Sequence, residues 1–179
     1  MMFLLRMLTR KRAREMDPLH VSMTGVRMGE RFLQIGCRDR ALLSGLAAKV
    51  GLSGGAAVAA LDPIDAGNAE AVGRKVGALI EVQNIDDGAW PYPDDQLDMV
   101  VVDDTNGTFA EREHRGAVLS NARRALRPGG RIEVISRAKT NVPSYDVERE
   151  LSDADFKPVR LLAERDGFRF VEGLRAAGS

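Results

Sequence analysis

Short apolar runs alternate with segments of helical periodicity along most of this chain. The pattern predicts five strands, at Arg31–Ile35, Ala56–Leu61, Leu79–Val82, Leu97–Val102 and Arg131–Ile135. It predicts helices between them, at Ala41–Val50, Ala66–Val76 and Arg112–Leu126. Continuously apolar strands separated by helices are typical of a parallel sheet covered on both faces. We therefore expect an α/β fold with a doubly wound sheet.

The pattern changes after Ile135. A short helix is expected at Tyr145–Ala154, and two alternating segments, Val159–Glu164 and Phe168–Gly173, flank Asp166-Gly167. An Asp-Gly pair between alternating segments is a strong hairpin signal. The prediction is a single Rossmann-like sheet, mostly parallel, with an antiparallel C-terminal hairpin. We expect residues 29–179 to form this domain, preceded by a basic amphipathic helix and linker at 1–28.

Candidate binding residues follow the predicted strands. In doubly wound sheets, ligands bind beyond the carboxyl ends of the strands, where the strand order reverses. An acid that closes the second strand, here Asp62, is well placed to accept hydrogen bonds from a ribose diol. Asp62 precedes Pro63, so a simple turn-forming role is the alternative. The candidates at this edge are Gly36, Cys37, Arg38, Asp62, Pro63, Ile85, Asp86 and Asp103.

Two longer motifs resemble a known family. Trp90–Val102 reads WPYPDDQLDMVVV, and Ala122–Ile132 reads ARRALRPGGRI. Together they resemble the class I S-adenosylmethionine-dependent methyltransferases of the ubiquinone/menaquinone-biosynthesis type (methyltransferase domain 11), over residues 29–173. In that family, Leu-Pro-Phe-Pro-Asp-x-Ser-Phe-Asp leads into strand four and Arg-x-Leu-(Lys/Arg)-Pro-Gly-Gly into strand five. The resemblance implies S-adenosylmethionine as cofactor and a small-molecule methyl acceptor.

The resemblance also implies roles for single residues. Asp62 falls where the family has its ribose-binding acid. Asp86 falls at the acid that accepts a hydrogen bond from the adenine amino group, and Ile85 where an apolar residue flanks the ring. Cys37 lies beside the cofactor, where the family often also has cysteine, and is interpreted as a packing residue.

The first loop departs from the family pattern. Where the family has an acid, any residue, and then Gly-x-Gly-x-Gly, residues 34–40 read Gln-Ile-Gly-Cys-Arg-Asp-Arg, a degenerate glycine-rich loop. Glycine at such turns allows positive φ and close approach of a ligand. Arginine held at such a position would store strain of about 1–3 kcal/mol. We therefore expect either a strained loop or a shifted one.

The loop also changes the charge of the site. Gln34 offers no charge to the cofactor's ammonium, while Arg38 and Arg40 add two positive charges. These arginines would suit a carboxylate or a phosphate. The alternative is that both point to solvent and neutralise Asp39 or another acid.

Composition limits the class of protein. With 179 residues and 44% hydrophobic content, the chain suits one globular domain. Lys plus Arg equals Asp plus Glu at 26 each, so no overall field attracts nucleic acid. The single cysteine excludes an internal disulfide, and we expect a cytoplasmic protein.

The positive charge is concentrated at the N-terminus. Met1–Met16 carries five basic residues against one acid, and apolar residues crowd its start. It suits a helix on an anionic membrane or a partner protein, or a helix packed on the domain. No apolar run is long enough to cross a bilayer. Membrane association through this segment is therefore the alternative to a purely cytoplasmic location.

Candidate catalytic residues are scarce, and we assign none. His20 and His114 are candidate bases, although a solvated histidine is the more common outcome. The pair Asp103-Asp104 lacks the further ligands that would specify a metal site, so no metal is expected. Methyl transfer from a sulfonium can rely on positioning alone.

Three functions from different classes remain open. The chain is a methyltransferase acting on a small molecule, a non-catalytic binding or assembly subunit that has lost the cofactor, or a binder of another nucleotide-like ligand through Arg38 and Arg40. No sizeable insertion follows the fifth strand to cover an acceptor. A partner protein, an oligomer or an open site is therefore expected.

Overall fold

The fold is built on one seven-stranded sheet. A computed structural model describes residues 18–85, 90–139 and 145–178. The strand order is β3-β2-β1-β4-β5-β7-β6. The strands are β1 Arg31–Ile35, β2 Gly55–Ala60, β3 Ile80–Asn84, β4 Leu97–Asp104, β5 Leu126–Arg137, β6 Val159–Arg165 and β7 Phe168–Leu174. The helices are α1 Pro18–Met23, α2 Arg40–Val50, α3 Pro63–Val76, α4 Arg115–Ala125 and α5 Val147–Asp153. Among the helices of these described ranges, none has the length and apolar character that a membrane span requires.

Strand pairing confirms the predicted fold class. The strands from β3 through β5 pair in parallel, and β7 then pairs antiparallel with both β5 and β6. Asp166 and Gly167 have φ values of 54° and 84°, which is the conformation an Asp-Gly hairpin turn needs. The sheet is therefore doubly wound and mostly parallel, with the antiparallel hairpin at its C-terminal end.

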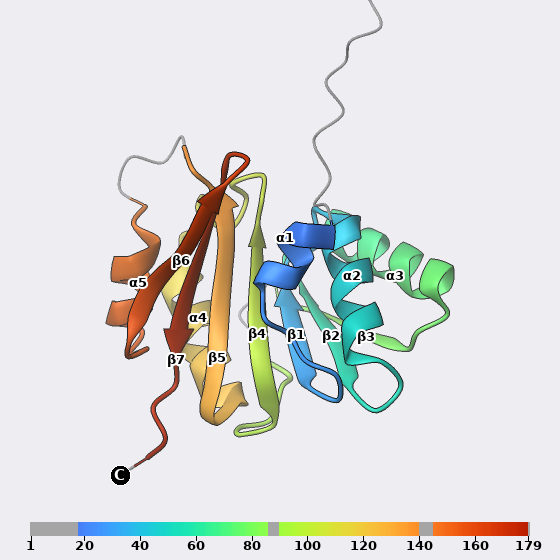
Figure 1. Ribbon diagram of the computed structural model, residues 1–179, viewed down its shortest axis with the longest axis horizontal. Helices are drawn as coiled ribbons and strands as arrows, with labels where there is room; N and C mark the ends of the chain where they lie inside the picture. The colour runs from blue at the N-terminus through green and yellow to red at the C-terminus, as the bar shows by residue number, and fades with distance from the viewer. Residues whose placement is uncertain (1–17, 86–89, 140–144, 179) are drawn as a thin grey trace, which may run out of the picture.

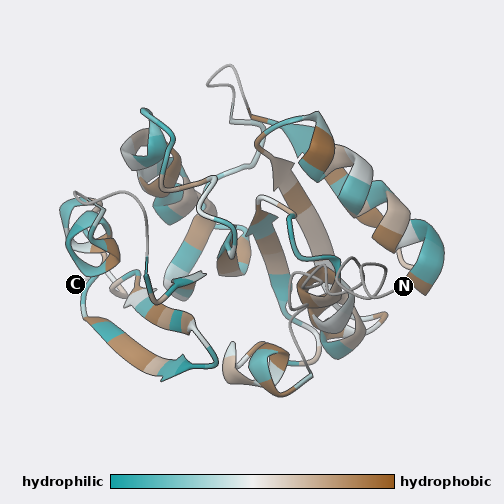
Figure 2. Cartoon of the chain, turned by 90° about the horizontal axis from the view of Figure 1, so that it is seen from above, coloured by the Kyte–Doolittle hydropathy of each residue, from teal (hydrophilic) through white to brown (hydrophobic). Residues whose placement is uncertain are grey.

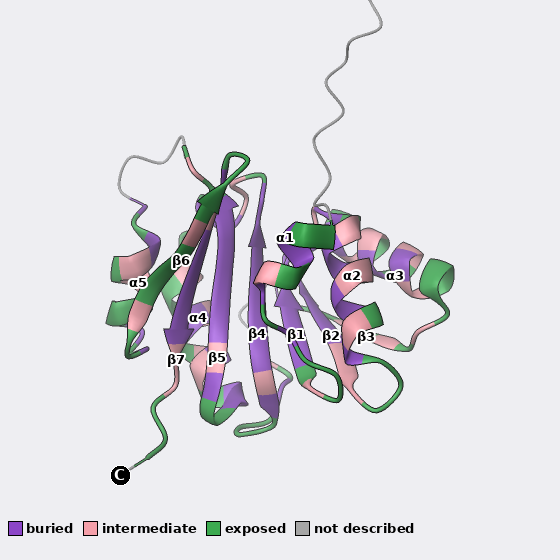
Figure 3. Ribbon diagram, viewed as in Figure 1, coloured by how far each residue is buried: buried purple, intermediate pink, exposed green. Residues whose placement is uncertain are grey.

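Helices cover both faces of the sheet (Figures 1 and 2). Residues of α1, α2 and α3 pack in one hydrophobic cluster, and residues of α4 and α5 pack in the other. The central strands β1, β4 and β5 are buried along most of their length, whereas the edge strand β6 is largely exposed (Figure 3). This burial explains why the central strands are rich in apolar residues.

The start of α3 differs from the predicted one. We expected Pro63 to end the second strand and the helix to begin at Ala66, but α3 begins at Pro63 itself. Oδ1 of Asp62 accepts hydrogen bonds from the backbone N–H groups of Ile64 (2.9 Å) and Asp65 (3.0 Å) and so caps the helix. Proline suits the first helical position because that position needs no N–H donor.

The Pro-Gly-Gly segment is held by the C-terminal end of the chain. The N–H of Gly129 donates to the Arg175 carbonyl (2.9 Å), and the N–H of Arg175 donates to the Gly130 carbonyl (2.9 Å). The Arg175 guanidinium also donates to the carbonyls of Arg124 (2.9 Å) and Leu126 at the end of α4. These bonds satisfy carbonyls that a helix end leaves without partners.

A buried acid lies inside the sheet on β5. Glu133 is fully buried, and neither carboxylate oxygen has a hydrogen-bond partner within the described residues. Its neighbour across the sheet on β7 is another acid, Glu172. Burial, with a contribution from Glu172, raises the pKa of Glu133 to about 8.

This acid predicts a pH-dependent stability. Between its ordinary pKa of 4.5 and about 8, Glu133 keeps a proton in the folded state and loses it on unfolding. Stability should therefore fall as pH rises through this window, by roughly 1.4 kcal/mol per pH unit for one such group. Glu133→Gln should remove that part of the slope in urea unfolding measured from pH 5 upward.

The matched control is Glu70→Gln, which changes a glutamate whose side chain is 60% exposed. It should leave the slope unchanged. If Glu133→Gln gave the same slope as the wild type, Glu133 would not carry the proton.

Candidate functional site

The candidate site lies where the strand order reverses, between β1 and β4. Gly36 follows β1 with a φ of +76°, and a Cβ built there would lie 3.1 Å from the backbone oxygen of Asp103. The Gly36 N–H donates to the Ala59 carbonyl (2.9 Å). Glycine is required at this position because φ is positive and because a Cβ would lie too close to the backbone at the end of β4.

The next two family glycine positions are not strained. Among the described residues, positive φ outside glycine occurs only at Asp95, Asp155 and Asp166. Arg38 and Arg40 therefore have ordinary backbone conformations. Of the two expected loops, the structure has the shifted one, which tolerates side chains at these positions.

Asp103 at the carboxyl-terminal part of β4 holds the loop in place. Its Oδ2 accepts hydrogen bonds from the backbone N–H groups of Arg38 and Asp39, both at 2.8 Å. Its Oδ1 accepts from the N–H of Thr105 (3.2 Å) and from its hydroxyl (2.6 Å). Burial raises the pKa of Asp103, although these bonds favour the carboxylate. Both oxygens are thus used inside the protein.

The guanidinium of Arg38 lies on two carboxylates. Its Nη2 donates to Oδ2 of Asp62, and its Nε lies 3.0 Å from Oδ1 of Asp65. The Arg38 side chain is 17% exposed and the Asp65 side chain is fully buried. The expected neutralisation of an acid is therefore correct for Arg38, but its side chain does not point to solvent.

The two acids are occupied on their other oxygens as well. Oδ1 of Asp62 caps α3, so both of its oxygens have partners. Oδ2 of Asp65 accepts from the N–H of Leu61 (3.1 Å). Burial raises the pKa of Asp65, and nearby Arg38 acts in the opposite direction. The ion pair thus compensates a buried negative charge.

A second arginine reaches the same edge. Arg112 lies between β4 and α4, and its Nη1 donates to the Leu61 carbonyl after β2 (2.9 Å). Because β1 lies between β2 and β4, this side chain spans the loop end of β1. The sequence pattern placed Arg112 at the start of the fourth helix, but α4 begins at Arg115. This contact was therefore missed.

The side chains of the remaining loop residues each have different partners and do not form one common binding site. Nε of Arg40 donates to Oδ1 of Asn68 (2.8 Å), away from Arg38. Cys37 is fully buried, and burial raises the pKa of its thiol, which fits the expected packing role. Gln34 is buried in β1; its amide donates to the Gly36 carbonyl (3.0 Å), and Oε1 has no hydrogen-bond partner within the described residues.

The other candidates at the strand ends are structural or lie outside the described residues. Pro63 begins α3, and Ile85 is buried in the hydrophobic core. Asp86 lies outside the described residues. Asp104 accepts hydrogen bonds from the N–H groups of Phe109 (2.8 Å) and Ala110 (3.2 Å), and burial raises its pKa to about 6.

The two histidines lie in different environments. His20 was expected to be solvated, but it is buried, with Nε2 3.0 Å from Oδ2 of Asp166 and its ring against Phe168 and Phe170. It joins α1 to the C-terminal hairpin. His114 precedes α4 and is exposed. Neither lies among the residues around Arg38 that are described above.

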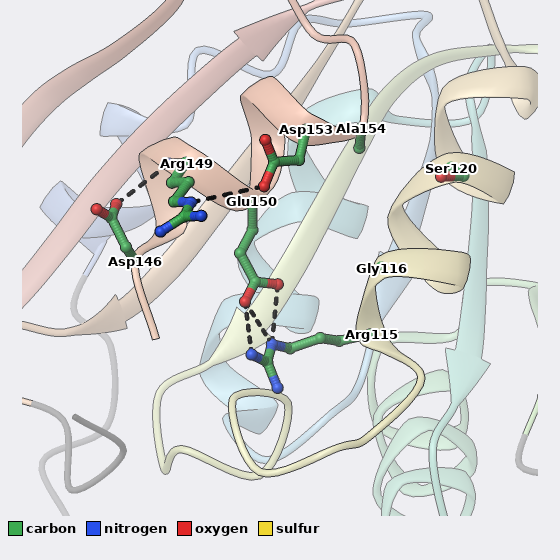
Figure 4. A pocket seen from close by; sticks show the side chains of 8 residues that line it. All are labelled: Arg115, Gly116, Ser120, Asp146, Arg149, Glu150, Asp153 and Ala154. Atoms are coloured by element: carbon green, nitrogen blue, oxygen red, sulfur yellow. Dashed lines mark hydrogen bonds and ion pairs between the residues drawn. The ribbon is translucent and has the colours of Figure 1, made fainter. Parts of the chain in front are cut away.

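A pocket of about 480 Å³ opens between α4 and α5 (Figure 4). Its main charges are paired, because Nε of Arg115 donates to both carboxylate oxygens of Glu150 at 2.7 and 2.8 Å. The same guanidinium lies over the Tyr145 ring, 5.3 Å from its centre. This cluster braces the two helices. Across the described ranges, no three His, Cys, Asp or Glu side chains gather as a metal site.

Comparison with known proteins decides the family. The sequence profile described as "Methyltransferase domain" matches residues 33–134, more than half of the chain. This chain belongs to the methyltransferase domain family. No curated protein matches it in sequence.

Solved structures share the fold of this methyltransferase-family domain. A SAM-dependent methyltransferase from Aquifex aeolicus is 22% identical, with a TM-score of 0.75 over 89% of this chain and 90% of that one. A SAM-dependent O-methyltransferase from Thermotoga maritima is 17% identical, with a TM-score of 0.66 over 93% and 68%. The [4+2]-cyclase SpnF is 14% identical, with a TM-score of 0.65 over 89% and 79%. At these identities the likeness concerns the fold.

Membership in this family implies S-adenosylmethionine as the ligand of this edge. The described residues do not fit that cofactor in their present arrangement. Both oxygens of Asp62 are occupied, and the N–H groups of Arg38 and Asp39 are directed to Asp103. The Arg38 side chain lies on Asp62, the acid that the sequence predicts would bind the ribose.

The buried ion pair predicts a stability effect. Arg38→Ala should lower the free energy of unfolding by on the order of 3 kcal/mol, because it leaves buried Asp65 without its cation. Urea unfolding at neutral pH measures this loss. Arg74→Ala is the control, since that arginine is 72% exposed, and it should change stability by less than about 0.5 kcal/mol. Equal small effects of both variants would contradict the assigned ion pair.

Proposed function

We propose that this methyltransferase-family domain is a non-catalytic binding or assembly subunit whose cofactor edge is closed by its own side chains. The observation that carries this proposal is the position of Arg38 between Asp62 and Asp65. A guanidinium there takes the hydrogen-bonding capacity that a ribose diol would use.

Charge supports the same conclusion. S-adenosylmethionine carries a positive sulfonium and an ammonium group, and Gln34 offers no negative charge to either. If Arg38 stayed in place, it would keep Oδ2 of Asp62 from a ribose hydroxyl. If it moved away, Asp65 would remain buried without a cation, which typically costs several kcal/mol. Either arrangement weakens cofactor binding.

Backbone geometry adds a second obstacle. The carboxylate of Asp103 already accepts hydrogen bonds from the backbone N–H groups of Arg38 and Asp39. These donors are therefore not available to a ligand. Arg112 crosses to the Leu61 carbonyl at the same edge. A ligand would have to displace several of these contacts at once.

The second candidate is methyl transfer from S-adenosylmethionine to a small molecule. It is favoured by the family match over residues 33–134 and by an acid, Asp62, at the expected position. This function requires the Arg38 guanidinium to leave Asp62 when the cofactor enters.

Calorimetric titration separates the two functions. Wild-type protein should give no binding heat with S-adenosylmethionine or its demethylated product, S-adenosylhomocysteine, at millimolar ligand. Arg38→Gly tests the cause, because it removes the guanidinium from the Asp62 carboxylate. Heat that appears only in Arg38→Gly would support closure by this side chain.

Wild-type binding would contradict the proposal. If Asp62→Asn abolished that binding, the second candidate would be the correct one. Asparagine keeps the ability to cap α3, so this variant tests the carboxylate and not the helix. Arg74→Gln serves as the control for Arg38→Gly, because it removes a positive charge from the exposed surface of α3.

A further inference from the structure

A groove of about 630 Å³ runs between α1, α2 and α3, on the face away from α4 and α5. Small residues of α2 and α3 line it, among them Ala41, Gly45 and Ala71. At Gly45 a Cβ would lie 2.7 Å from Cγ1 of Val21, so α1 packs directly on the α2 backbone there. These small side chains keep the groove open and its floor apolar.

The charges around this groove all have one sign. Arg40, Lys49 and Lys75 line it, and among the residues that the structure describes no aspartate or glutamate does. Lys49 and Lys75 form no ion pair with any described residue, and Arg40 binds only the neutral side chain of Asn68. Within the described residues, these three cations thus have no ion-pair partner, in a chain whose formal net charge is zero.

The first described residue of the chain lies at this groove, and the basic segment precedes it in the sequence. Pro18, the first described residue, lines the groove. The residues before it include the five bases of Met1–Met16 and an apolar start that contains Phe3, Leu4, Leu5 and Leu8. In the sequence, the basic segment Met1–Met16 therefore comes just before the first described residue that lines the groove.

We propose that the α1–α2–α3 groove binds an anionic lipid surface. Lipid phosphates would contact Arg40, Lys49 and Lys75, and the apolar start of the chain would enter the acyl boundary. This combination of clustered bases and adjacent apolar residues is the chemistry by which proteins bind the surface of anionic membranes. The proposal goes beyond the proposed function and does not depend on it, because no ligand at the strand ends is involved.

Vesicle flotation of the full chain tests the groove. The wild type should float with mixed phosphatidylglycerol–phosphatidylcholine vesicles and not with phosphatidylcholine alone. The double variant Lys49→Ala, Lys75→Ala should partition roughly 25-fold more weakly, since each base near a lipid surface contributes roughly fivefold. The matched control is Lys139→Ala, Lys157→Ala, which removes two exposed lysines elsewhere and should bind like the wild type.

Three results would overturn the proposal. The first is an absence of wild-type partitioning to anionic vesicles. The second is equal partitioning of the two double variants, including the case in which only deletion of residues 1–16 abolishes binding. The third is binding to soluble poly-glutamate without binding to vesicles, which would assign the groove to an acidic protein. Circular dichroism of each variant checks that lost binding does not reflect unfolding.

Discussion

The carboxyl edge of the sheet depends on one internal ion pair, between the Arg38 guanidinium and the carboxylates of Asp62 and Asp65. Asp65 is buried in the first turn of α3, where an uncompensated charge would be costly. Arg38 supplies the compensating charge, and Asp103 fixes its backbone by accepting two N–H groups of the same loop. These contacts thus hold the loop, the helix start and the strand end together.

These internal contacts concern the strand-end residues and leave the family fold of the chain unchanged. Methyltransferase-family domains are scaffolds on which function resides in the strand-end residues. Here the scaffold is complete, from the parallel strands through the antiparallel hairpin. The strand-end groups are engaged internally, and unpaired charge instead lies on the α1–α2–α3 groove.

Much of the fold could be predicted, because its signals are local. Apolar strands, Asp166-Gly167 and the Pro-Gly-Gly segment each specify a conformation through their own side chains or backbone. The predicted boundaries of helices and strands were wrong where one residue has two roles. Pro63 was expected to end the second strand, but β2 ends at Ala60 and Pro63 begins α3. Arg112 has the periodicity of a helix, yet it lies before α4 and binds the Leu61 carbonyl.

The sequence by itself determined the doubly wound sheet and the family, and it predicted a loop with arginines at two glycine positions of that family, near an acid at the expected ribose position. It left two possible interaction partners for the Arg38 side chain, a ligand or a neighbouring acid. Only the tertiary structure decided between them, because Asp62 and Asp65 are distant along the chain and meet Arg38 only where β1 and β2 end side by side. Hydrophobic periodicity is encoded locally, whereas the partner of a charge depends on which strand ends the fold brings together.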